Sequence, residues 1–338
     1  FQGMRTVIYR FVRSSWVLLL LLVACDSKPK SVVKPHSKGL PSELLIVADE
    51  AVGKSDVMDS LIAMTQEPVP EIMQPEPMFR VLRVSARNYT QRYVTMHTKL
   101  FVHLDAEVAK PMMGIARDVC AFPQTEVTIS ASNLRDLRSF LARHKQEVVE
   151  ALLEGQLLVR IEDLRKQHNA HVCQQAIKHL GYSIFVPKSV CAVKKEPRFL
   201  WAGSNLQERD MNVVIYEYPW DGRPLEDIEH LVTVRDSVMK RNIPGERDGQ
   251  WMQTSRVDGT PLVIGQKKQS CGHEYFEMRG MWDVRKAPIG GPFVAMYTLD
   301  SLRRTVLATE GFVYSPSTEK RDLIRLVEAS LLTIKKQK

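Results

Sequence analysis

The sequence lacks several features that would have assigned a function at once. No apolar run reaches the ~20 residues that a helix needs to cross a bilayer. Cysteine is rare, at five in 338 residues, and no two cysteines form a Cys-x-x-Cys pair, which argues against zinc and redox motifs of that kind. The signatures Gly-x-Ser-x-Gly and Gly-x-Gly-x-x-Gly are also missing, so the usual nucleophile and dinucleotide motifs are excluded.

One stretch, LLIVADEAVGKSD, looks at first like a phosphate-binding P-loop. That motif requires a glycine five residues before Gly53, where Ala48 stands. Asp49 and Glu50 occupy the bend, and their carboxylates would repel a polyphosphate. We therefore expect no nucleotide partner, and interpret Gly53 as a turn and Ser55 as a helix N-cap.

The first 24 residues predict an export signal. Residues 1–3 look like the remnant of an expression tag, and residues 4–24 carry three arginines, no acid and then a short apolar stretch. The run Leu-Val-Ala-Cys, which ends at Cys25, resembles the bacterial lipobox, whose cysteine receives diacylglycerol. We expect lipidation at Cys25, which would hold the protein on a membrane. The alternative is an ordinary cleavage site beside a cysteine.

Residues 25–40 predict a basic, flexible tether. Residues 26–39 contain four lysines, two prolines and no apolar periodicity. Loss of the signal would remove three arginines and no acid, so the formal charge would fall from +8 to +5. This modest charge, on an exported protein, argues against nucleic acid as a partner.

Four cysteines remain beyond Cys25, at positions 120, 173, 191 and 271. An exported protein can form disulfides, and four cysteines allow three pairings. Because a chain of this length can build a core without disulfides, four buried thiols are an equal alternative.

The pattern of apolar residues predicts an α+β protein of two domains. The first, 41–181, combines strands with long helices. The second, 182–338, reads as an antiparallel sheet with helices packed on its faces. Its helices are expected at 225–242 and 317–335.

Three signals place helix ends in the first domain. Ser132 or Asn133 is expected to cap a long helix. Gly155 is expected to interrupt this helix, and Gly181 to end the one that follows.

Two clusters of metal-ligand residue types are weak candidates. On a helix, His168 and His171 would lie about 60° apart, and Cys173 about 140° from His168. On a strand, the segment Cys-Gly-His-Glu at 271–274 would direct its glutamate away from the other two side chains. We therefore predict no metal site and no cofactor.

Aromatic residues beside arginine and glycine gather in the second half, as at interfaces and polar-ligand clefts. Arg279 would offer a fork of donors to a carboxylate or phosphate, and Trp282 a flat apolar anchor. The alternative is that Trp282 and Phe293 fill the core and the glycines make turns. The candidate contact residues are Arg279, Trp282, Gly290, Gly291, Phe293 and Trp220.

The lipobox and segments such as LPSELLIVAD, FEMRGMWDVRKAPIGGPFVAMYTLD and EGFVYSPSTEKRDLIRLVEASLLTI resemble an uncharacterised lipoprotein family of Bacteroidetes, a domain of unknown function. The resemblance implies a Gram-negative envelope lipoprotein and supplies no activity or catalytic residue. Surface-exported lipoproteins of that phylum usually carry acidic residues after the cysteine. Here Asp26 is followed by Lys28 and Lys30, which departs from that pattern and favours the periplasmic side of the outer membrane. The second half also resembles the PsbP-like α/β/α fold, an analogy of architecture alone.

These observations predict a membrane-anchored envelope protein that acts by binding an envelope protein, a cell-wall component or a lipid. The alternative is an envelope hydrolase, in which Glu277 or Glu310 would form an acid/base pair with a histidine. A third possibility is a purely structural lipoprotein.

Overall fold

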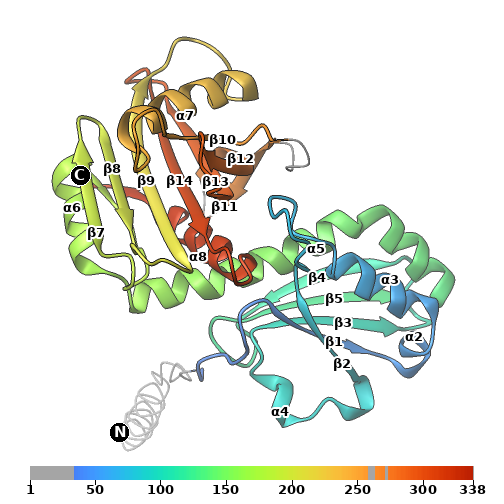
Figure 1. Ribbon diagram of the computed structural model, residues 1–338. Helices are drawn as coiled ribbons and strands as arrows, with labels where there is room; N and C mark the ends of the chain where they lie inside the picture. The colour runs from blue at the N-terminus through green and yellow to red at the C-terminus, as the bar shows by residue number, and fades with distance from the viewer. Residues whose placement is uncertain (1–33, 258–262, 271–272, 338) are drawn as a thin grey trace, which may run out of the picture. The chain divides into compact units, whose positions relative to one another are not determined.

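The computed structural model describes residues 34–257, 263–270 and 273–337. The predicted tag, signal and lipidation site, together with Cys271, lie outside the described residues. The described residues from Pro35 onward form one compact unit, which contains every helix and strand described here (Figure 1). Among the described residues, no helix is both long enough and apolar enough to cross a membrane.

The first sheet has five strands in the order β2-β1-β3-β5-β4. The first four in this order run parallel, and β4 is antiparallel at the edge. Parallel sheets are covered on both faces, so their central strands are apolar throughout. This is why ELLIVA, which forms β1, is buried at every position after the first. The strands are β1 (Glu43–Ala48), β2 (Arg80–Ser85), β3 (Thr98–Leu104), β4 (Met112–Arg117) and β5 (Thr125–Ala131).

One helix of this half, α5 (Leu134–Lys166), is much longer than the others. The predicted cap is confirmed, because the Asn133 side chain accepts a hydrogen bond from the Asp136 amide. The predicted interruption at Gly155 is wrong. The helix continues through it, and a Cβ there would lie 2.7 Å from the side chain of Thr125, so glycine is needed for close packing. The shorter helices are α2 (Glu50–Gly53), α3 (Asp56–Thr65), the 3-10 helix η1 (Ala86–Asn88) and α4 (Gln91–Val94).

The predicted helix stop at Gly181 is confirmed. Helix α6 (Ala170–Leu180) ends there with Gly181 in the left-handed region, at φ 80°, which glycine adopts at little cost. At the other end, the side chain of Asn169 accepts hydrogen bonds from two backbone amides of the first turn.

The second sheet has eight strands, all antiparallel. Seven follow the order β10-β12-β13-β14-β9-β8-β7, and β11 pairs with β12. The strands are β7 (Ala192–Glu196), β8 (Phe199–Gly203), β9 (Asp210–Pro219), β10 (Met252–Thr254), β11 (Ile264–Ser270), β12 (His273–Val284), β13 (Gly290–Asp300) and β14 (Thr305–Tyr314). A separate pair of short strands joins β6 (Tyr182–Ser183) to β15 (Lys335–Lys336).

Helices cover both faces of this sheet, which confirms the predicted α+β class and the helix-covered antiparallel sheet (Figure 1). In the middle of β13, even-numbered residues pack with α8 (Arg321–Leu331) and odd-numbered residues pack with α7 (Ile228–Asn242). This division follows from the alternation of side chains along a strand. We call the two sides the α8 face and the α7 face.

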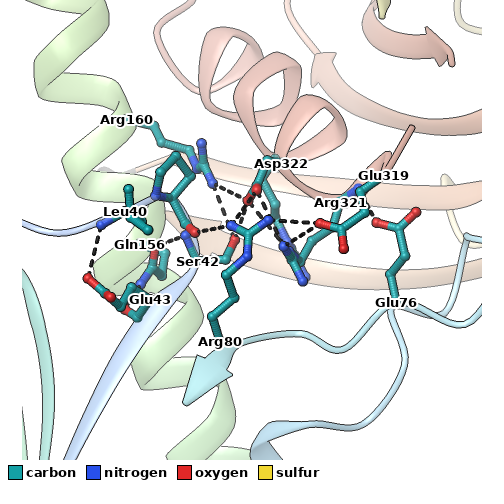
Figure 2. Close-up of polar contacts among 12 residues, drawn as sticks. Leu40, Ser42, Glu43, Glu76, Arg80, Gln156, Arg160, Glu319, Arg321 and Asp322 are labelled. Atoms are coloured by element: carbon teal, nitrogen blue, oxygen red, sulfur yellow. Dashed lines mark hydrogen bonds and ion pairs between the residues drawn. The ribbon is translucent and has the colours of Figure 1, made fainter. Parts of the chain in front are cut away.

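The start of α8 is bound by residues from the first half of the chain (Figure 2). The Asp322 carboxylate accepts hydrogen bonds from Ser42 Oγ at 2.6 Å, Arg80 Nη1 at 2.8 Å and Arg160 Nη2 at 3.1 Å. Ser42 has a φ of 59°, an uncommon conformation for a residue other than glycine. We call Asp322 and these three partners the clamp, because they join segments far apart in the sequence.

A second carboxylate caps the same helix. The N-cap residue of α8, Lys320, makes no side-chain cap of its own. Glu76 accepts instead from the backbone amide of Lys320, at 2.8 and 3.0 Å, and from that of Arg321, at 2.8 Å. A carboxylate at this position satisfies free amides and interacts favourably with the helix dipole.

The described end of the predicted tether is paired with the rest of the chain. The amide of Ser37 donates to the carbonyl of Phe122, and the amide of Lys38 to that of Thr95. Backbone pairing of this kind orders a segment whatever its composition, so the basic sequence at 34–40 does not make these residues a free linker.

Candidate functional site

The structure buries Arg279 in an ionic network on the α8 face. Its Nε donates to Glu277 at 2.7 Å, its Nη1 to Glu71 at 2.8 Å, and its Nη2 to Glu277 and Glu328. Burial alone would raise the pKa of Glu277, but the charges of Arg279 and Lys268 lower it to about 2. All three guanidinium nitrogens are therefore bound to carboxylates of this protein, and the predicted donor fork is already used.

Trp282 lies on the other side of the same sheet. Its ring meets that of Phe312 edge-on, at 5.3 Å between centroids, in the core under α7. Phe293 is fully buried on that face as well, with the guanidinium of Arg235 4.1 Å from its ring centre. The structure therefore does not bring Arg279 and Trp282 together.

The remaining predicted contact residues have packing roles. A Cβ on Gly291 would lie 2.0 Å from the carbonyl oxygen of Val313, and one on Gly290 would lie 2.6 Å from that of Trp282. The glycines thus permit strands to approach closely. Trp220 follows β9, and its indole N–H donates to the carbonyl of Arg223 at 2.6 Å.

Neither carboxylate of the predicted hydrolase pair has a histidine among its described partners. Glu310 accepts two hydrogen bonds from Arg235, at 2.9 and 2.7 Å, and both side chains are fully buried. Burial raises the pKa of Glu310 in spite of the charge of Arg235. Glu277 is bound by Arg279, Gln266 and Lys268.

The predicted metal candidates His168, His171 and Cys173 do not assemble, and Cys271 of the other cluster lies outside the described residues. In the part of the chain that the structure describes, no three His, Cys, Asp or Glu residues form a metal-binding group. His168 Nδ1 lies 3.1 Å from the carbonyl of Leu164, and its ring stacks on Phe185. Cys120, Cys173 and Cys191 are free thiols.

The Gly-Lys-Ser segment follows β1, and its polar groups bind their neighbours. Lys54 forms an ion pair with Glu50 at 2.6 Å. Ser55 occupies the N-cap position of α3, as predicted, but its hydroxyl donates to the carbonyl of Val52 and caps no helix amide.

An apolar groove lies on the α8 face, beyond the end of α8. The helix has 11 residues, about 16 Å, whereas β13 has 11 residues, about 36 Å. The helix therefore leaves part of the strand uncovered. The prediction that this helix reaches residue 335 is wrong, because Lys335 and Lys336 pair with β6 and turn the chain away.

The groove has a volume of about 660 Å³ and mostly apolar walls. Leu307 and Ile334 are half-buried there, so they border the free space without being part of the closed core. The other apolar residues along its walls are Met296, Leu299, Leu331 and Leu332. The sequence predicts Ile334 as a buried helix residue and gives no sign that a groove opens beside it.

The mouth of the groove carries an exposed leucine and several basic residues. Leu302, in the turn between β13 and β14, is 97% exposed. Arg303 and Arg304 follow it in the same exposed turn, and Lys335 and Lys336 lie at the rim. Within the described residues, Asp300 pairs with Arg303 and Lys336. We call the turn 301–304 the basic tip.

Comparison with family models finds two domains of unknown function. Residues 169–333 match the model of Domain of unknown function (DUF4837), and residues 37–164 match that of Domain of unknown function (DUF8532). The matches meet near the end of α5, and together they include both sheets. No curated protein matches the chain. An uncharacterised type of protein was expected from the sequence, and both models are of that kind.

Proposed function

We propose that this protein is a lipid-anchored protein of a bacterial envelope that binds the acyl chain of a lipid in the apolar groove. The observation that carries this proposal is the groove itself. Its volume of about 660 Å³ is in the range of small-molecule sites, and such sites are mostly apolar with a few polar groups. An acyl chain is the envelope component that matches such walls.

The basic tip supports a lipid over other apolar ligands. A fully exposed leucine costs little in solution and gains free energy in the acyl region of a membrane. Arg303 and Arg304 follow Leu302 directly, and each basic side chain near an anionic membrane surface contributes about 1 kcal/mol. Contact between the basic tip and the membrane would present the mouth of the groove to lipid headgroups.

The anchor is supported by the sequence. The basic, apolar and small-residue parts of residues 4–24 precede Cys25 in the order of a lipoprotein signal. The resemblance to a Bacteroidetes lipoprotein family extends the proposal to the periplasmic side of an outer membrane. Mass spectrometry of the native protein tests the anchor directly, because processing and acylation change the mass of the peptide that begins at Cys25.

Native mass spectrometry of the full chain, released from detergent, tests the groove. We expect the wild type to retain a lipid in addition to its covalent anchor. The variant Leu307→Gln should reduce the lipid-bound fraction about tenfold, because a polar amide against an acyl chain costs about 1 to 3 kcal/mol.

Leu206→Gln is the matched control, since Leu206 is 50% exposed outside the groove. This variant should retain lipid as the wild type does. The proposal is contradicted if Leu307→Gln retains as much lipid as the wild type, or if the wild type retains no lipid. A thermal melt of each variant verifies that the chain is folded.

A further inference from the structure

A second cleft lies on the α8 face, apart from the groove. It has a volume of about 560 Å³ and is bordered by loop 67–78, α5, β11 and α8. We call it the charged cleft, because ionisable residues of both signs line it. They include Glu71, Glu150, Arg143, Lys268 and Arg325.

One carboxylate oxygen of the charged cleft has no donor. Glu71 is only 2% exposed, and its Oε1 accepts from Arg279 at 2.8 Å. Its Oε2 is buried and has no hydrogen-bond partner among the described residues. Buried polar atoms are nearly always paired, so an unpaired one at the wall of a cleft indicates a missing donor.

The neighbouring ionic network does not supply that donor. Arg279 directs its other nitrogens to Glu277 and Glu328, Lys268 pairs with Glu277, and Arg325 pairs with Glu328. With Glu71, this makes three cations and three carboxylates. The network is therefore balanced in charge, and its cations are already bound to carboxylates.

Donors for an anion lie in the same cleft. In the described part of the chain, Arg143 makes no ion pair, and its Nε donates only to the carbonyl of Ser139. The next residue, His144, departs from helical geometry, at φ −115° and ψ 15°. Helix α5 is therefore kinked beside the charged cleft.

We propose that the charged cleft binds an α-amino acid group, with an ammonium and a carboxylate on one carbon. The ammonium would donate to Glu71 Oε2, and the carboxylate would accept from Arg143. Each charged group of the ligand would then lie beside a protein group of opposite charge, and the unpaired oxygen of Glu71 would gain a donor. The ligand is a free amino acid or a larger molecule that ends in such a group. The inference does not depend on the lipid groove.

Isothermal titration calorimetry of the full chain in detergent micelles tests the inference, with alanine as the probe. Propionate lacks the ammonium and ethylamine lacks the carboxylate, so both should bind at least about tenfold more weakly than alanine. A dipeptide carries its ammonium and its carboxylate on different carbons, so it should also bind at least about tenfold more weakly than alanine.

Two variants locate the binding. Arg143→Gln should weaken the binding of alanine about tenfold. The variant should still fold, because this side chain makes no ion pair in the described structure. Glu71→Gln should abolish binding, since an amide replaces the oxygen that receives the ammonium. Arg135→Gln, an exposed arginine on the same helix and outside the charged cleft, is the matched control and should bind as the wild type does.

The inference is overturned if alanine gives no binding, if propionate or ethylamine binds equally well, or if Arg143→Gln binds like Arg135→Gln. If Glu71→Gln fails to fold, the comparison of Arg143→Gln with Arg135→Gln still tests the inference. These outcomes leave the lipid proposal untouched, because Leu307 and the groove are not varied.

Discussion

Replacement of Asp322 by asparagine tests whether the clamp stabilises the fold. Asparagine keeps the shape of the side chain and removes its charge, so the guanidinium groups of Arg80 and Arg160 lose their shared carboxylate. The Asp322 side chain is 21% exposed and that of Arg160 10%, whereas Arg80 is 40% exposed and can turn to water.

The cost can be estimated from these exposures. Removal of one partner of a buried ion pair costs about 3 to 5 kcal/mol. Because Arg80 can recover some hydration, we expect Asp322→Asn to lower the free energy of unfolding by about 2 to 4 kcal/mol. Urea unfolding followed by circular dichroism measures this difference. The control is Asp56→Asn, whose exposed pair with Arg138 predicts a much smaller loss.

The effect should also depend on pH. Burial alone would raise the pKa of Asp322, but hydrogen bonds from Ser42 and Arg321 and the charge of Arg160 hold this pKa well below its usual range. A carboxyl with a lowered pKa in the folded state stabilises the protein above its unfolded pKa, about 3.9, and loses this contribution as the pH falls further. The difference between wild type and Asp322→Asn should therefore be full at neutral pH and shrink below about pH 4. An equal loss in Asp322→Asn and Asp56→Asn would refute the reasoning.

Two further substitutions test the packing of the second sheet by urea unfolding. Gly311→Ala should cost about 1 to 3 kcal/mol, because the new Cβ would lie 2.7 Å from the side chain of Val327, whereas Gly53→Ala meets no atom within 4 Å and should cost little. Arg235→Met should cost about 3 to 5 kcal/mol, because it leaves Glu310 buried without its partner, and the double variant Arg235→Met/Glu310→Leu should recover most of this loss. Equal stability of the two glycine variants, or of the single and double variants, would contradict these expectations.

The apolar pattern predicted strands well where one or both faces are buried. β5 (Thr125–Ala131) alternates strictly between buried and half-buried residues, which is the pattern that predicts a strand from sequence. β4 (Met112–Arg117) was missed because it is an edge strand with mostly exposed side chains. Its sequence, MMGIAR, carries no alternation that a pattern can detect.

The end of α8 was mispredicted for a tertiary reason. Leu331 and Ile334 keep the spacing of a helix, but residues 335–336 pair with Tyr182 and Ser183, more than 150 positions earlier in the chain. A pairing so distant in sequence leaves no local signal. The groove exists because of it, so the sequence could not predict the site.

The structure separates two of the predicted contact residues. Arg279 and Trp282 are three residues apart on one strand, and an odd separation places side chains on opposite faces. The spacing alone could therefore have shown that the two side chains lie on opposite faces of the sheet. Nothing in the sequence, however, indicates that Glu71 and Glu328, one before and one after Arg279, would use its donors.

Photo-cross-linking of the full chain in vesicles tests the central claim most directly. The vesicles contain phosphatidylethanolamine and phosphatidylglycerol, with a diazirine near the end of one phospholipid acyl chain, and mass spectrometry identifies the labelled residues. Binding in the groove predicts labels on Leu307, Ile334 and Met296. Labels confined to the basic tip, or none on the residues of the groove, would show that the protein meets the membrane surface without taking an acyl chain into the groove.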